Sequence, residues 1–309
     1  MSDDTSDLAG TPAPSDTLAI QSIAVLGAGT MGRGIAQVAA AAGYETRLYD
    51  VEQSLLDAAR GRIAKNLDKG VELGKLTAGA AEETRARLSY HLDLAAAVAG
   101  AGLVIEAIPE SMALKIETFR RVAESAPAEA IFASNTSSLS VTEMAAGCGR
   151  PLRFAGMHFF NPVHLMKLVE IIRGLETAPE TIATIEEVSR RMGKTTVVVN
   201  ESPGFVTSRI NALIGNEAFR MLQEGVATAE DIDTAIKLGL NHPMGPFEMA
   251  DLVGLDVRLA ILEHLHRTLG DTFRPSNLLA QYVKAGRFGR KVGKGVYEYD
   301  EEGRKKQPS

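Results

Sequence analysis

Two residue types that exchange protons stand close together in residues 153–174, RFAGMHFFNPVHLMKLVEIIRG. His158 lies in the first half, and Glu170 interrupts an apolar run, KLVEII, in the second. A carboxylate in such a run is costly to bury without a partner. If the two halves form antiparallel strands, His158 and Glu170 can face each other, and the carboxylate then fixes the imidazole tautomer and stabilises its protonated form. Such a pair suits a general base that takes the proton of an alcohol while hydride leaves its carbon.

Each of these residues also has a plainer interpretation when it is taken singly. His158 can be a structural, hydrogen-bonded histidine, and Glu170 can point to solvent from an edge strand. The polar cluster SNTSSL at 134–139, which follows an apolar strand, can be a loop of helix-capping residues. The other histidines have no comparable partner in the sequence and are expected to be structural or surface residues: His91, His164, His242, His264 and His266.

A second constellation, IAVLGAGTMGRGIAQ, contains Gly27, Gly29 and Gly32 in the pattern G-x-G-x-x-G. An apolar run precedes the glycines, helical apolar spacing follows them, and the next expected strand ends in Asp50. This frame is typical of a dinucleotide site, in which the glycines allow a tight turn and the helix N-terminus attracts the pyrophosphate. Asp50 stands where a carboxylate binds the ribose 2′-hydroxyl and repels a 2′-phosphate, which predicts NAD rather than NADP. The alternative is a glycine turn that binds nothing.

Around these residues the sequence predicts a Rossmann-like α/β domain at 20–203 and an all-helical domain at 204–309. Strands and helices alternate in the first part, and the expected strand at 101–109 contains Glu106. After Pro203-Gly204 the apolar residues follow helical spacing only. Helices are expected there over 206–222, 228–240, 251–270 and 276–287. Residues 1–19, which are acidic and rich in Pro, Ser and Thr, are expected to form a disordered tail.

Composition excludes several functions. A net charge of −6 over 309 residues gives no basic field for nucleic acid or an anionic membrane. No apolar run is long enough to span a membrane, and the N-terminus lacks the features of a signal peptide, so a cytoplasmic location is expected. The one cysteine, Cys148, excludes an intramolecular disulfide, and no metal site is expected.

Eight motifs, which occur in order between about residues 20 and 300, carry a family resemblance: GAGTMG, EAIPE, ASNTSSL, HFFNPV, KLVEII, PGFVTSR, HPMGPFEMADLVGLD and FGRKVGKGVY. In these motifs the chain resembles the short-chain L-3-hydroxyacyl-CoA dehydrogenases, including the 3-hydroxybutyryl-CoA dehydrogenases. The resemblance implies NAD-dependent oxidation of an L-3-hydroxyacyl-CoA to the 3-ketoacyl-CoA, or the reverse reduction. It also implies a substrate site between the two domains and a homodimer formed through the helical domain.

The resemblance also implies roles for individual residues. His158 matches the catalytic base of the family, Glu170 its carboxylate partner, and Ser137 the serine that contacts the reacting oxygen. The implied cofactor-binding residues are Gly27, Ala28, Gly29, Thr30, Met31, Gly32, Asp50, Glu110, Lys115, Asn161 and Lys291.

The implied substrate contacts are weaker. Asn66 and Lys69 lie on the helical segment where the family binds CoA, although a solvated helix face explains them equally well. Ser208 stands where the family commonly has asparagine in P-G-F-x-x-N-R. Serine keeps a donor and an acceptor but is shorter and lacks the amide geometry, so an altered substrate preference stays open.

Three alternatives remain beside this function. The same chemistry can act on a small 3-hydroxy acid such as L-carnitine or L-gulonate. A second alternative is a non-enzymatic NAD(H)-binding protein, like the crystallins recruited from this superfamily. The presence of Ser137, His158 and Glu170 argues against a loss of catalysis. The 6-phosphogluconate or 3-hydroxyisobutyrate dehydrogenase type relies on a catalytic lysine, and the His158/Glu170 pair argues against it. The sequence does not determine the acyl chain length of the substrate or the physiological direction of the reaction.

Overall fold

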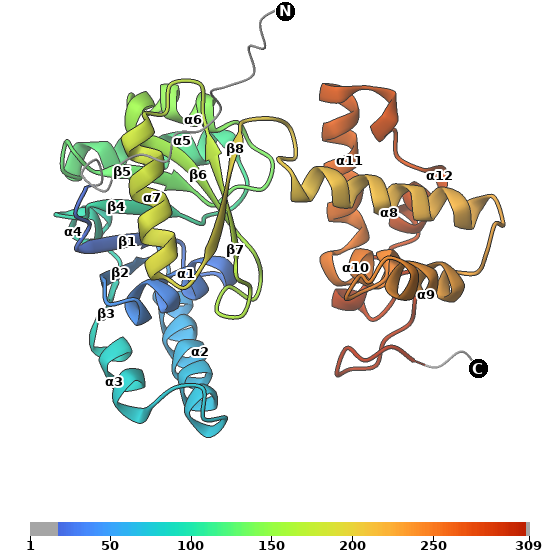
Figure 1. The fold of residues 1–309 in the computed structure, drawn as a ribbon, viewed down its shortest axis with the longest axis horizontal. Helices are drawn as coiled ribbons and strands as arrows, with labels where there is room; N and C mark the ends of the chain where they lie inside the picture. The colour runs from blue at the N-terminus through green and yellow to red at the C-terminus, as the bar shows by residue number, and fades with distance from the viewer. Residues whose placement is uncertain (1–17, 307–309) are drawn as a thin grey trace, which may run out of the picture. The chain divides into compact units, whose positions relative to one another are not determined.

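A computed structural model describes residues 18–306, and its contacts divide the chain into two units at Glu201 and Ser202 (Figure 1). The disordered tail predicted for residues 1–19 lies outside the described residues except at its end. There the backbone N–H of Leu18 donates to Thr184 Oγ1 at 3.0 Å, which anchors the start of the described chain.

The first unit is built on one eight-stranded sheet with the strand order β3-β2-β1-β4-β5-β6-β7-β8 (Figure 1). Neighbouring strands are parallel except β6 and β7, which pair antiparallel. The central strands are apolar and buried on both faces, as strands of a covered parallel sheet must be. The strands are β1 (Ser22–Leu26), β2 (Glu45–Tyr49), β3 (Leu88–His91), β4 (Leu103–Glu106), β5 (Ile131–Ser134), β6 (Phe154–Phe159), β7 (Leu168–Arg173) and β8 (Thr195–Asn200).

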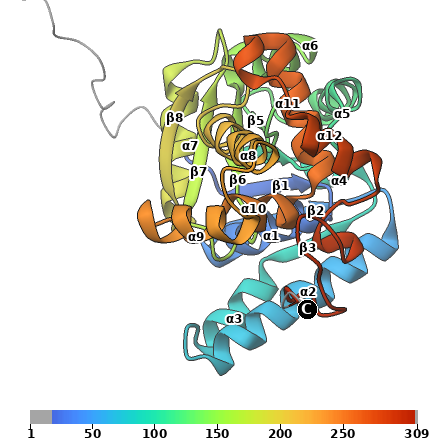
Figure 2. The same ribbon diagram turned by 90° about the vertical axis from the view of Figure 1, so that its right-hand side faces the viewer.

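Helices cover both faces of this sheet. Apolar residues of α1 and α7 share one core cluster with the strands, and Phe119 of α5 packs on Phe132 and Phe154 on the other face. Helices α2 and α3 lie side by side (Figure 2). The helices are α1 (Thr30–Ala41), α2 (Gln53–Glu72), α3 (Ala78–Ala86), α4 (Leu94–Val98), α5 (Met112–Ser125), α6 (Val141–Gly147) and α7 (Pro179–Arg191). The predicted Rossmann-like class is confirmed.

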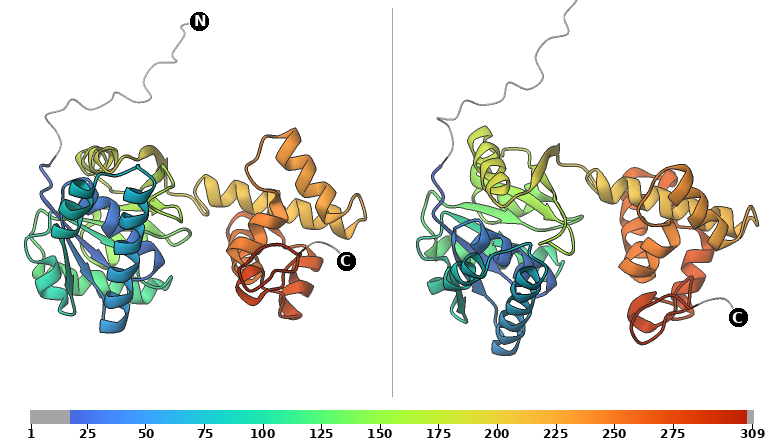
Figure 3. Two further views of the ribbon diagram at one scale, coloured as in Figure 1. Left: turned by 90° about the horizontal axis from the view of Figure 1, so that it is seen from below. Right: turned by 60° about the horizontal axis from the view of Figure 1, so that its bottom comes forward.

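The second unit is helical in its described part, as predicted (Figure 3). Its helices are α8 (Thr207–Gln223), α9 (Ala229–Gly239), α10 (Pro246–Val253), α11 (Leu255–Leu269) and α12 (Asn277–Lys284). Helix α9 begins at a Thr228 cap, whose side chain accepts the N–H of Asp231.

One predicted helix of this unit is wrong. Residues 251–270 were expected to form a single helix, but the chain breaks at Gly254, where φ is +108°. That backbone conformation favours glycine, and a Cβ there would lie 2.9 Å from Asp256 Oδ1. The break ends α10 and starts α11, although the apolar pattern runs through both helices.

Two buried aspartates tie the second unit together. Asp251 of α10 accepts the backbone N–H groups of Val296 and Tyr297 and the hydroxyl of Tyr299, all within 2.9 Å. Asp233 of α9 likewise accepts N–H groups of α10 and the Tyr297 hydroxyl. These bonds hold the C-terminal segment to two helices. Among the described residues, no helix is both long and apolar enough to cross a membrane.

Candidate functional site

His158 and Glu170 face each other at the centre of the antiparallel pair of strands. The register pairs them directly, and His158 Nδ1 lies 2.7 Å from Glu170 Oε2. The Glu170 side chain is fully buried, whereas the His158 side chain keeps 11% of its surface exposed. The antiparallel arrangement inferred from the sequence is therefore confirmed, and the carboxylate has the partner that its burial requires.

The loop after β5 is tied to the histidine strand. Asn135 accepts the backbone N–H of Phe159 through Oδ1 at 2.9 Å, so the polar loop starts beside His158. On the far side of Phe159, the chain turns at Asn161, which is joined to Pro162 by a cis peptide bond. The structure thus brings the Ser/Thr loop and the end of the His158 strand together, at the carboxyl ends of β5 and β6.

Glu106, at the end of β4, forms a fully buried ionic cluster with Lys115 of α5. Lys115 Nζ lies 2.6 Å from Glu106 Oε1, and Ser134 donates its hydroxyl to Glu106 Oε2 at 2.6 Å. The N–H of Ile108 donates to the same carboxylate. Burial raises the pKa of Glu106, and the Lys115 ammonium opposes that shift. The sequence placed Glu106 in the expected strand at 101–109 but gave this carboxylate no role of its own in the site.

Glu110 extends this cluster to the serine loop. Its Oε2 lies 3.2 Å from Lys115 Nζ, and its Oε1 accepts the backbone N–H of Ser137 at 3.1 Å. The Thr136 hydroxyl donates to the same oxygen. A continuous chain of contacts therefore runs from Glu106 through Lys115 and Glu110 to Ser137.

The glycine loop and Asp50 line one hollow of about 560 Å³. Asp50 Oδ2 accepts the N–H of Ala28 at 2.7 Å, which links the carboxylate to the loop. At Gly27 φ is +98°, and a Cβ there would lie 2.7 Å from Ala107 O. A Cβ on Gly32 would lie 1.7 Å from Gly27 O, so this turn excludes larger residues at both positions. Thr30 and Met31 also line the hollow, as do apolar side chains of α4 and α5.

A second hollow, of about 620 Å³, lies between α1, α2 and the turn that follows β6. Asn66 and Lys69 both line it, together with His164. Asn66 Nδ2 donates to Gln37 at 3.0 Å, and Lys69 pairs with Glu72 on an exposed surface. Lys75 and Arg191 add further positive charge to the lining.

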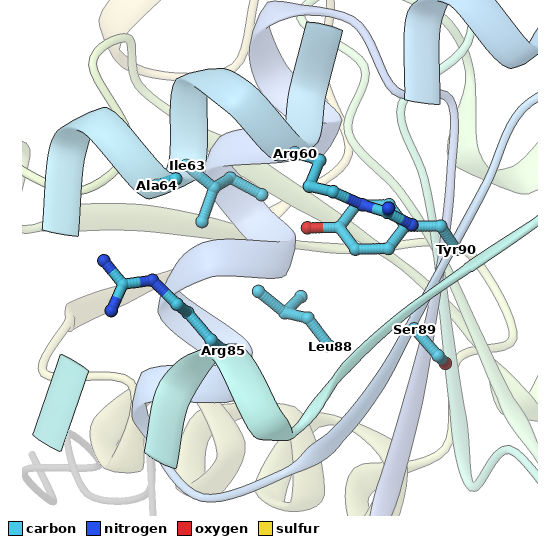
Figure 4. A pocket seen from close by; sticks show the side chains of 7 residues that line it. All are labelled: Arg60, Ile63, Ala64, Arg85, Leu88, Ser89 and Tyr90. Carbon is cyan, nitrogen blue, oxygen red and sulfur yellow. The ribbon is translucent and has the colours of Figure 1, made fainter. Parts of the chain in front are cut away.

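A third hollow, of about 470 Å³, lies between α2, α3 and β3 (Figure 4). The guanidinium carbon of Arg60 lies 4.5 Å from the centre of the Tyr90 ring. Arg85, on the other side of the hollow, pairs with Asp68 and Glu82. Both cations are thus engaged within the chain, and we assign this hollow no role.

Two predicted site residues belong to the second unit and are described within it. Ser208 lies in the first turn of α8. Lys291 Nζ lies 2.7 Å from both carboxylate oxygens of Asp256, close to the Gly254 break. In the described ranges of both units, no group of three or more His, Cys, Asp or Glu side chains could hold a metal ion.

Comparisons with known proteins cover both units. Residues 22–202 match the family described as "3-hydroxyacyl-CoA dehydrogenase, NAD binding domain", and residues 204–299 match "3-hydroxyacyl-CoA dehydrogenase, C-terminal domain". The probable 3-hydroxybutyryl-CoA dehydrogenase of Bacillus subtilis is 49% identical over 91% of this chain and 98% of its own length. The mitochondrial hydroxyacyl-coenzyme A dehydrogenase of Homo sapiens is 40% identical over 91% of each chain. The solved (S)-3-hydroxybutyryl-CoA dehydrogenase of Ralstonia eutropha superimposes with a TM-score of 0.89, at 42% identity over 92% of this chain and all of that one.

Proposed function

The chain belongs to the 3-hydroxyacyl-CoA dehydrogenase family, and from that premise we propose that it oxidises L-3-hydroxyacyl-CoA to 3-ketoacyl-CoA with NAD, or catalyses the reverse reduction. The predicted family and its NAD-binding domain are confirmed by the matches at 22–202 and 204–299. The observation that carries the proposed chemistry is the 2.7 Å contact between His158 and a wholly buried Glu170.

His158 acts as the general base in this proposal. Glu170 holds the Nδ1 side of the imidazole, so Nε2 takes the proton of the substrate's 3-hydroxyl as C3 loses hydride. The carboxylate of Glu170 stabilises the imidazolium that forms. In the reverse direction Nε2 returns this proton to the oxygen of the 3-keto group. When bound, NAD would accept the hydride.

Ser137 contacts the reacting oxygen in this proposal. Its backbone N–H donates to Glu110, which fixes the residue at the turn after β5. We assign its hydroxyl to the substrate oxygen, where a hydrogen-bond donor stabilises the negative charge that develops. The tie between Asn135 and Phe159 keeps this loop in register with His158.

The hollow at the glycine loop fits a dinucleotide. Its turn is too crowded for any residue larger than glycine at Gly27 and Gly32, and its lining combines backbone amides, the Asp50 carboxylate and apolar side chains. We assign the pyrophosphate to the start of α1 and the adenosine ribose to Asp50. Lys115, Glu110, Asn161 and Lys291 are the remaining proposed cofactor contacts, by likeness to the family.

The hollow lined by Asn66 and Lys69 is the proposed site of the CoA moiety. Its positive lining, which includes Lys75 and Arg191, suits the phosphates of CoA. Its wall also includes His164, in the same turn that carries Asn161. A homodimer formed through the helical unit and a cytoplasmic location stay predictions.

Ser208 favours one second candidate, a free 3-hydroxy acid such as L-carnitine or L-gulonate, because it departs from the family's asparagine. The test follows NADH loss with acetoacetyl-CoA, and NADH formation with carnitine or gulonate plus NAD. We expect fast turnover with acetoacetyl-CoA only. Activity confined to a free hydroxy acid would overturn the CoA substrate, and silence in all assays with intact NADH binding would leave the NAD(H)-binding alternative.

A further inference from the structure

Lys194 is a buried cation whose partners are backbone carbonyls. It lies between α7 and β8, immediately before β8, and its relative exposure is 9%. Its ammonium donates to the carbonyl oxygens of Val163 and Met166, the latter at 2.8 Å. Burial lowers the pKa of Lys194. His164 is the titratable group that it influences, and burial together with this cation lowers the pKa of His164.

An ammonium in this place is costly. Burying a charge that is balanced only by neutral carbonyls is unfavourable compared with an apolar side chain of similar length. Methionine would fill nearly the same volume without that cost. We therefore look for the reason for a lysine here in the segment that its hydrogen bonds fix in place.

Those bonds hold the turn between β6 and β7. Within the turn, the carbonyl of Pro162 accepts the N–H groups of Leu165 and Met166, both at 2.9 Å. Val163 packs on α1, where a Cβ added to Gly34 would lie 2.9 Å from it. Lys194 adds two bonds from outside, so the turn is fixed to the start of β8 at the same end of the sheet (Figure 1).

This turn carries residues of both proposed binding sites. Asn161, a proposed cofactor contact, lies at its start, and His164 lines the hollow with Asn66. We propose that Lys194 is a positioning residue of the reaction, whose ammonium fixes the β6–β7 turn and thereby places Asn161 and the CoA-side wall. This inference rests on the proposed function for its kinetic effects, and on the turn geometry together with the proposed cofactor contact of Asn161 for its effect on NADH binding.

The test compares Lys194→Met, which keeps the stem and removes the donor, with Lys194→Arg, which keeps the charge and its donors. Lys65→Met, on the exposed surface of α2, is the matched control. We measure kcat and KM with acetoacetyl-CoA, and the Kd for NADH by fluorescence, well below the melting temperature of each variant. Lys194→Met is expected to lower kcat/KM by ~10–100-fold and to raise the Kd for NADH by about tenfold, with Arg restoring most of both.

A purely structural lysine would give a different result. Lys194→Met would then melt earlier while its kcat, KM and Kd for NADH stayed within about twofold of the wild type, and this outcome overturns the inference. If the Met variant does not fold, Lys194→Gln, which loses the charge but keeps an amide NH₂ group, takes its place under the same criteria. If the wild type does not turn over acetoacetyl-CoA, the proposed function fails, and the NADH Kd of the Lys194 variants still decides this inference.

Discussion

At the scale of single residues, burial distinguishes the two members of the proposed catalytic pair. Glu170 is fully enclosed and aligned by the strand register, so its carboxylate orients an imidazole that retains slight access to the surface. The pairing could be predicted from sequence because only a short turn separates two apolar runs. Which atoms meet, Nδ1 with Oε2, required the structure.

Asp50 is the residue that we expect to determine the preference for NAD over NADP. Asp50→Ala removes the carboxylate that lines the hollow and accepts the Ala28 N–H. Loss of a hydrogen bond to a charged group costs ~1.5–3 kcal/mol, so we expect the Kd for NAD to rise about 10–100-fold and that for NADP to change less. Titration calorimetry with both cofactors measures this. Asp50→Asn, which keeps an acceptor for Ala28, separates loop support from ribose binding. An unchanged ratio of the two affinities would rule out the ribose role.

At the scale of elements, the ends of β4 and β5 are joined by the Glu106 cluster. Glu106 takes Lys115 from α5 and Ser134 from β5, and Glu110 then carries the contact to Ser137. Position at a strand end was readable from sequence. The closure of this network was not, because it depends on how far the Lys115 side chain reaches back from the next helix.

Glu106→Gln tests this junction. Removing one charge of a fully buried pair typically costs ~3–5 kcal/mol. In this variant Lys115 would stay buried with only the partly exposed Glu110 carboxylate beside it. The expected loss of unfolding free energy is of that order, measured by urea denaturation. The control Glu82→Gln, at an exposed pair with Arg85, should cost less than ~1 kcal/mol. Equal losses in the two variants would contradict a structural role for the buried cluster.

Three features of the elements escaped prediction for physical reasons. The Gly254 break is invisible in an apolar pattern that continues across it, since only the backbone angle marks it. The short helices α4 and α6 offer too few turns for a periodicity to be recognised. Lys194 stands just before β8, at a position where a lysine is ordinarily a surface residue.

At the scale of the whole molecule, the chain forms two folded units that are stabilised in different ways. The first relies on a covered sheet, whereas the second relies on helices and the buried carboxylates Asp233 and Asp251. The alternation of strands and helices, and its loss after residue 203, indicated this division. The carboxylate network was not predicted, because its partners come from residues far apart in the sequence.

Asp251 predicts a pH-dependent contribution to stability. Burial raises its pKa above the ordinary 3.8, so the folded state holds this proton more tightly than the unfolded state. The linked stability is complete below the unfolded pKa and is lost as pH rises through the folded pKa. The difference in unfolding free energy between wild type and Asp251→Asn should therefore grow as pH is lowered from neutral towards the ordinary 3.8, measured by urea unfolding. A difference that is constant or shrinks would contradict the raised pKa.

The most direct test of the central claim compares the turnover of acetoacetyl-CoA by the wild type, His158→Gln and Glu170→Gln, with NADH binding measured on the same samples. General base catalysis contributes ~10²–10⁴ in rate, so each variant should lose at least ~10²-fold in kcat while its Kd for NADH changes little. Near-normal turnover in either variant would contradict the assignment of the pair as general base and carboxylate partner.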